Sequence, residues 1–142
     1  AALAEGDLAT VRALLGRDYD VDGLVVHGDH RGRTLGFPTA NLATLAEALP
    51  KDGVYAARVE VRGTDQRYDG VLNLGVRPTA GAGRSLEVHV LDASPELYGR
   101  TLRVTFVARL RDERRFEGLD ALRAQIARDV DDARAALKGR PA

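Results

Sequence analysis

Apolar and polar residues alternate in five segments of the chain, and this period of two predicts β-strands. Turn-forming clusters separate most of them: GTDQR (63–67), RPTAGAG (77–83) and ASPELYGR (93–100). Five strands in about 90 residues, with no helix between most of them, indicate an antiparallel barrel or sandwich. The segments are YDVDGLVVHG (19–28), GVYAARVEV (53–61), YDGVLNLGV (68–76), SLEVHVLD (85–92) and TLRVTFVARL (101–110).

A helical period appears at both ends of the chain. At the first end, DLATVRALL (7–15) predicts a short helix that Asp7 caps and Gly16 ends, with Leu8, Val11 and Leu15 along one face. Because the strands begin only after this helix, we expect residues 1–17 to be a linker from a preceding domain.

A longer helix is expected at the C-terminal end. Apolar residues recur there at intervals of three and four residues, and the resulting face would cover the barrel. Recruitment of a partner helix is the alternative. The apolar face comprises Leu119, Leu122, Ile126, Val130, Ala133 and Leu137, and the side chains available to solvent are Arg123, Arg128, Asp129, Asp131 and Asp132.

Length and composition are those of one folded domain. Of 142 residues, 44% are apolar, which is enough for a packed core. The 21 basic residues balance the 21 acidic ones, so no general attraction to nucleic acid or to an anionic membrane is expected. The lack of cysteine excludes disulfides, thiolate metal sites and a cysteine nucleophile.

Targeting signals are also missing. No apolar run approaches the roughly 20 residues of a membrane span and no signal peptide is visible, which predicts a cytoplasmic protein. Methionine is absent, even at position 1. Since natural chains begin with methionine, we expect this chain to be a piece of a longer protein, truncated at its N-terminus.

Several widespread catalytic motifs do not occur. There is no GxxxxGK[ST] loop, no GxGxxG that opens a helix after a strand, and no GxSxG elbow. The three histidines, His27, His30 and His89, lack HExxH spacing, so a zinc site built from them is disfavoured.

The loop GDHRGRTLGFPTAN (28–41) has the composition of a phosphate-binding segment. Gly28, Gly32 and Gly36 recur every four residues with arginines among them, and such glycines let the backbone approach a ligand closely. Thr39 supplies a hydroxyl that can ligate Mg²⁺, and Asn41 adds a neutral oxygen for the same cation or a donor for phosphate. The alternative is a flexible connection that ends at a proline.

The segment LEVHV (86–90) places one carboxylate on a predicted strand. Alternation puts Glu87 and His89 on the side opposite the apolar residues. A carboxylate fixed on a strand makes a good general base if a hydroxyl can reach it. The alternative is a glutamate that simply faces solvent.

Taken together, the motifs resemble those of the riboflavin kinase family. They are GFPTAN (36–41), Pro50 followed by GVY (53–55), VLNLGVRPT (71–79), LEVHVLD (86–92), LYG (97–99) and LRDERRF (110–116), and they extend the resemblance from about residue 19 to 137. The resemblance implies a six-stranded antiparallel Greek-key β-barrel with a C-terminal helix, over residues 18–140. It also implies transfer of the ATP γ-phosphate to the 5′-hydroxyl of riboflavin, giving FMN and ADP.

The resemblance assigns roles to individual residues. Thr39 and Asn41 match the residues that hold Mg²⁺ and the nucleotide phosphates, and Glu87 matches the base. The segment 28–37 resembles a flap over the nucleotide, and 111–116 resembles a loop beside the flavin, which implies flavin contacts from Arg111 and Phe116. The implied nucleotide-binding set is Gly28, Arg33, Gly36, Phe37, Pro38, Thr39 and Asn41.

Some features limit or extend these assignments. The turn AGAG (80–83) and residues Glu117 and Gly118 depart from the family pattern, although glycine is an acceptable helix N-cap.

The leading helix resembles the linker of bacterial bifunctional FAD synthetases, which implies an N-terminal adenylyltransferase domain as partner. A non-catalytic flavin-binding barrel is the alternative function. Binding of single-stranded nucleic acid is disfavoured by the neutral charge and the 5% aromatic content.

Overall fold

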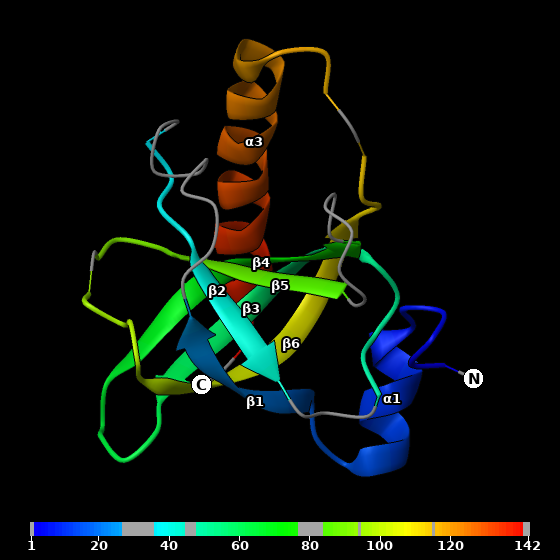
Figure 1. Cartoon of the computed structure of the whole chain (residues 1–142). Coiled ribbons are helices and arrows are strands. Elements are labelled where there is room, and N and C mark those ends of the chain that lie inside the picture. Colours follow the sequence, from blue (N-terminus) through cyan, green and yellow to red (C-terminus); the bar gives the residue numbers. More distant parts are fainter. Residues whose placement is uncertain are drawn as a thin grey trace.

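The computed structural model describes residues 2–26, 36–44, 48–76, 84–93, 95–114 and 116–140. Within them, six strands close into a barrel that one helix precedes and another follows (Figure 1). The helices are α1 (Leu8–Leu15) and α3 (Leu119–Lys138). The strands are β1 (Tyr19–Val26), β2 (Ala40–Thr44), β3 (Gly53–Val61), β4 (Arg67–Val76), β5 (Arg84–Val90) and β6 (Thr101–Arg111).

The strand order around the barrel is β1-β2-β5-β4-β3-β6, and every neighbouring pair is antiparallel. Strands β3, β4 and β5 follow one another around the wall, while β2 pairs with β5, which is a Greek-key arrangement. The predicted six-stranded barrel is therefore confirmed. The alternation pattern alone missed β2, because this strand has only five residues and begins inside the PTAN sequence that favours a loop.

Alternate side chains of the six strands fill the barrel interior. Tyr55 and Phe106 are fully buried there and form an edge-on pair with ring centroids 5.1 Å apart. Strand β3 is buried on both faces, since Tyr55 points inward while Val54 and Ala56 pack outward beneath α3. A strand covered on both sides requires an unbroken apolar run, which VYAA provides.

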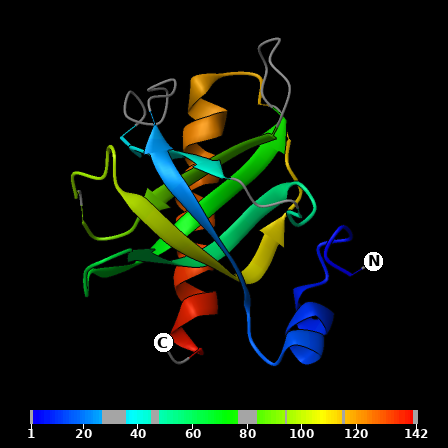
Figure 2. The same ribbon diagram turned by 60° about the horizontal axis from the view of Figure 1, so that its bottom comes forward.

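Helix α3 runs along the outside of the barrel and packs on β3, β4 and β6, as Figure 2 shows. The expected covering role is confirmed, with Ala133 and Leu137 buried in a second apolar cluster. Two expectations for this helix were wrong. Leu119 is 55% exposed, because the apolar contact is concentrated in the last turns. Asp129 is buried rather than in solvent, because its carboxylate is paired with Arg111 of β6.

Helix α1 packs beside β1 and β6, apart from α3. Asp7 caps it by accepting a hydrogen bond from Thr10 N, and Gly16 ends it at a φ of 76°, as predicted. Val11 is buried, but Leu15 is 51% exposed and does not share the buried face that the sequence pattern gave it. Neither helix described here combines the length and the apolar character that crossing a bilayer requires.

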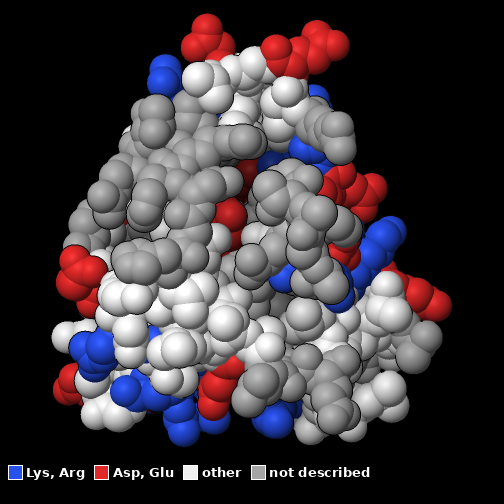
Figure 3. Space-filling model, in the orientation of Figure 1, with Lys and Arg blue, Asp and Glu red and all other residues white. Residues whose placement is uncertain are grey.

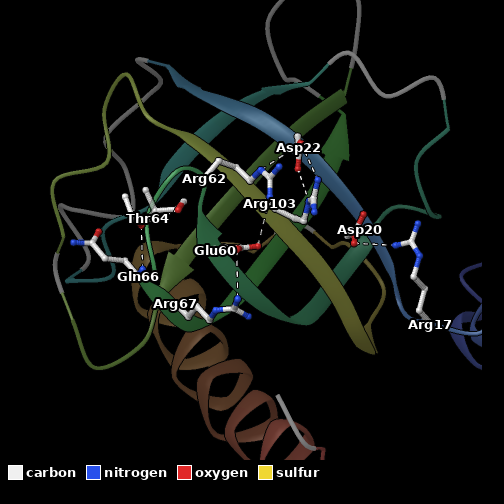
Figure 4. Close-up of polar contacts among 10 residues, drawn as sticks. Arg17, Asp20, Asp22, Glu60, Arg62, Thr64, Gln66, Arg67 and Arg103 are labelled. Atoms are coloured by element: carbon white, nitrogen blue, oxygen red, sulfur yellow. Dashed lines mark hydrogen bonds and ion pairs between the residues drawn. The ribbon is translucent and has the colours of Figure 1, made fainter.

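The outer faces of β1, β6 and β3 carry a network of paired charges (Figure 4). Asp22 accepts hydrogen bonds from Arg103 at 2.9 and 3.3 Å and lies 3.9 Å from Arg62. Glu60 lies 3.5 Å from Arg67 and 4.0 Å from Arg62. Each acidic group on this face thus has basic neighbours on adjacent strands or turns.

Candidate active site

Three polar side chains lie side by side on another part of the outer surface, and we call them the polar row. Asn41 of β2 pairs in register with Glu87 of β5, which pairs in register with Asn73 of β4. Their strand neighbours Leu42 and Leu86 fill the barrel interior, so the three side chains point outward. Residues directly opposite on antiparallel strands have Cβ atoms about 5 Å apart. The two asparagines therefore flank the Glu87 carboxylate at short range.

Thr39 precedes β2 by one residue and stands two positions before Asn41. In extended backbone this spacing puts both side chains on the same face. The fold thus brings the predicted metal and phosphate ligands to the face that carries the predicted base. Thr39 and Asn41 are both half-buried.

His89 fastens the segment before β2 to strand β5. Its Nδ1–H donates to the Pro38 carbonyl oxygen at 2.8 Å, which fixes the ring tautomer because a carbonyl can only accept. Its ring also lies edge-on to Phe37, with centroids 5.5 Å apart. Sequence reasoning considered His89 only as a zinc ligand, although its alternation with Glu87 already placed it on the same outer face.

The remaining nucleotide-binding predictions divide into two groups. Gly36 is described and exposed, with a φ of 87°, a conformation that L side chains rarely adopt. Among the described residues beyond its chain neighbours, no atom lies within 4 Å of the position a Cβ would take, so the backbone turn favours glycine here. Gly28 and Arg33 lie outside the described residues.

The predicted flavin contacts lie beyond Asn73, where the strand pairing continues from β4 to β3 and β6. Asn73 pairs with Val54, and Val54 pairs with Arg111. The Arg111 guanidinium donates to both carboxylate oxygens of Asp129 at 2.8 Å and lies 5.6 Å from the centre of the Phe116 ring. Asp129 neutralises Arg111, but the Arg114 guanidinium lies over the same ring, 4.7 Å from its centre. This end therefore offers a planar ligand an aromatic ring with a positive charge beside it.

Glu113 is a further residue of this face that the sequence did not single out. Its carboxylate lies over Gly75 of β4, with Oε2 only 1.7 Å from the point where a Cβ would stand. Asn73 stands two residues earlier on the same face of β4. Desolvation raises the pKa of Glu113, against the opposing effects of Arg111 and Asn73. Although much of the side chain is exposed, its carboxyl end is therefore a partly desolvated group beside the polar row.

The donors on this face are of the kind that hard cations prefer, but they are few. Among the described residues, no group of three His, Cys, Asp or Glu is placed to hold a metal ion. Figure 3 shows a few acidic atoms set back from the surface near the middle of this view. Among the described residues of this view, acidic and basic side chains are interspersed.

Comparisons with known proteins identify the family of the chain. A family model described as Flavokinase, riboflavin kinase, matches residues 15–137. The bifunctional riboflavin kinase/FMN adenylyltransferase of Escherichia coli (strain K12) is 50% identical over 135 residues, covering 94% of this chain and 42% of the relative. The chain thus spans less than half the length of that relative.

Two solved structures share the fold. The riboflavin kinase from Trypanosoma brucei is 25% identical with a TM-score of 0.58, over 84% of this chain and 79% of that one. A Streptococcus pneumoniae chain described as a macrolide-efflux protein is 36% identical with a TM-score of 0.86, over 94% of this chain and 44% of that one. The family match includes all six strands of the barrel and most of α3, and the chain belongs to the riboflavin kinase family.

Proposed function

We propose that the protein transfers the γ-phosphate of ATP to the 5′-hydroxyl of riboflavin, producing FMN and ADP. The observation that carries this proposal is the polar row, in which one carboxylate lies between two asparagines on the face that also bears Thr39. Membership of the riboflavin kinase family supports the reaction class. The proposal concerns the kinase half of the two activities that the name of the bifunctional relative combines.

Glu87 is the proposed general base. Its carboxylate accepts the proton of the 5′-hydroxyl as that oxygen forms a bond to the γ-phosphorus, and the bond to the bridging oxygen of ADP breaks. Phosphoryl transfer of this kind depends mainly on positioning and on charge stabilisation, with a base that orients the attacking alcohol. A carboxylate on the wall of a closed barrel has little backbone freedom, which favours accurate positioning.

Thr39 and Asn41 are the proposed ligands of a Mg²⁺–nucleotide complex. A hydroxyl and an amide carbonyl are hard oxygen donors, and Mg²⁺ usually keeps several waters and phosphate oxygens besides one or two protein ligands. So small a donor set fits an ion that arrives with the nucleotide better than one held permanently by the protein. Bound there, Mg²⁺ would neutralise charge on the phosphates.

The nucleotide and riboflavin would then bind beyond opposite ends of the polar row, the nucleotide next to Asn41 and the flavin beyond Asn73. Gly36, Phe37 and Pro38 adjoin Thr39, and we propose that they contact the nucleotide, as we do for Gly28 and Arg33 on sequence grounds. Phe116, stacked beside Arg111, is the proposed surface for the flavin ring. Glu87 lies between these ends, where the hydroxyl and the γ-phosphate must meet.

The direct test is product formation by the purified chain. Incubation with riboflavin, ATP and Mg²⁺, followed by chromatography of the flavins, should yield FMN and ADP in equal amounts. Omission of ATP or chelation of Mg²⁺ should abolish the product. Binding of riboflavin, seen as fluorescence quenching, without any FMN would contradict the proposal and favour the non-catalytic flavin-binding barrel.

A further inference from the structure

The end of β6 and the start of the loop after it contact the rest of the molecule at three successive residues. Arg111 pairs with buried Asp129 of α3 at 2.8 Å, and Asp112 pairs with Arg109 at 2.8 Å. Glu113 then extends over the outer face of β4. The two residues before Glu113 are thus each held by an ion pair, and the Glu113 carboxylate lies over Gly75.

Gly75 leaves the space that this carboxylate occupies. The three atoms nearest to a Cβ at position 75 all belong to Glu113, with Oε2, Cδ and Cγ at 1.7, 2.8 and 3.6 Å. Any other residue at position 75 would displace the carboxylate. No backbone atom is among these neighbours, so the displacement would not disturb the barrel wall.

Asn73 connects this carboxylate to the proposed base. Asn73 stands two residues before Gly75 on β4, so its side chain is on the face that the Glu113 carboxylate covers, and a hydrogen bond from Asn73 lowers the pKa of Glu113. On the neighbouring strand, Asn73 is directly opposite Glu87. The amide nitrogen carries two N–H groups that diverge in one plane. When Glu113 accepts one of them, the rotation of the amide is fixed and the second N–H is available toward the neighbouring strand.

We propose that Glu113 and Asn73 are positioning residues: Glu113 fixes the Asn73 amide, and Asn73 holds the Glu87 carboxylate in the orientation that accepts the hydroxyl proton. This inference rests on the proposed kinase function for its role in turnover. A base needs its oxygen within hydrogen-bond reach of the proton it accepts, and side chains that pack around it supply that accuracy. Neither Glu113 nor Asn73 has to touch a substrate in this arrangement.

Steady-state kinetics of Glu113 variants test the role in turnover. Glu113→Ala should lower kcat about tenfold, the effect of one lost hydrogen bond in the transition state, with KM for riboflavin and ATP within about twofold. Glu113→Gln should retain most of kcat, because its amide oxygen still accepts from Asn73. Glu117→Ala, which removes an exposed glutamate from the same loop, is the matched control and should change neither constant. A raised KM with unchanged kcat would overturn the inference, since Glu113 would then bind a ligand.

Double variants test whether Glu113 acts through Asn73. Asn73→Ala combined with Glu113→Ala should have the kcat of Asn73→Ala alone, because residues in one chain of contacts are not additive. Gly75→Ala should reproduce the Glu113→Ala defect without backbone strain, and thermal unfolding should show that it folds. Effects that multiply in the double variant would overturn the inference.

An NMR readout separates this inference from the kinase activity. The carboxyl ¹³C resonance of Glu87 should shift in Asn73→Ala and in Glu113→Ala but not in Glu117→Ala. If it stays unchanged in the first two variants, the chain of contacts is absent, whatever the turnover. If it shifts while the wild-type protein makes no FMN, the contacts are upheld and the proposed function fails.

Discussion

The outer surface of the barrel holds two carboxylates in similar positions but with opposite neighbours. Glu60 of β3 lies in register with Arg67 and Arg103, whereas Glu87 of β5 lies in register with two asparagines. Both glutamates are half-buried. The two glutamates are therefore similar in exposure and differ in the charge of their register partners.

The neighbours decide what each carboxylate is available for. On the charged face, Glu60 belongs to a network in which arginines surround the acidic groups (Figure 4). A carboxylate paired in this way contributes to the solubility of the protein. On the polar row, the register partners of Glu87 carry hydrogen-bonding groups but no charge. A carboxylate flanked in this way can orient and accept a proton, while the amide and hydroxyl oxygens beside it suit a cation.

The largest expected effect comes from replacing Glu87 by glutamine, with the same change at Glu60 as the control. Glu87→Gln should lower kcat for FMN formation by roughly 10²–10⁴-fold, because the variant keeps the shape of the side chain but cannot accept the hydroxyl proton. Calorimetry should show riboflavin and Mg–ADP affinities close to those of the wild type. Glu60→Gln is the matched control and should leave kcat within about twofold.

Two outcomes would break the comparison. Near-normal turnover of Glu87→Gln would remove that residue from the role of base. A comparable loss of turnover in Glu60→Gln would mean that the two faces do not differ in function.

A smaller effect is expected from the hydroxyl that precedes β2. Thr39→Ala should weaken Mg–ADP binding about tenfold or more, since a hydrogen bond or ligand contact to a charged group contributes roughly 1.5–3 kcal/mol. Thr44→Ala makes the same change at the far end of β2, where the hydroxyl donates to the Asp22 carbonyl at 2.7 Å, and should leave that affinity unaltered. Equal affinities of Thr39→Ala and the wild type in titration calorimetry would refute the assignment of Thr39 to the nucleotide.

The barrel was predictable from sequence wherever a strand is long. Strands β1, β3, β4, β5 and β6 have seven residues or more, and each was expected from its pattern. Strand β2 was not found from alternation, because its five residues begin within the turn-forming sequence PTAN and are too few to show a clear alternation. Asp129 was misplaced for a related reason. It stands three residues after Ile126 and four before Ala133, so it shares their face of α3, but only the tertiary pairing with Arg111 explains a buried charge there.

The site was predictable in its parts but not in its assembly. Alternation alone put Glu87 on the outer face, and the composition of GFPTAN singled out Thr39 and Asn41. The register that sets Asn73 and Asn41 on either side of Glu87 depends on how β2, β4 and β5 pair across the closed barrel. Glu113 lies in an irregular loop, where no alternation of apolar and polar residues indicates which way a side chain points. Its contact with Gly75 joins residues 38 positions apart in the sequence, and only the folded chain shows it.

The smallest expected effect concerns the charged face itself. Arg67 lies 3.5 Å from Glu60, but its side chain is 70% exposed, so water and salt screen the pair. Arg67→Gln should lower the free energy of unfolding by less than about 1 kcal/mol, and the coupling in the Glu60→Gln/Arg67→Gln cycle should be equally small. Urea unfolding at low and high salt measures both quantities, and FMN formation should be unchanged in all three variants. A coupling of several kcal/mol would mean that this network stabilises the barrel, and the contrast with the polar row would then be one of stability as well as chemistry.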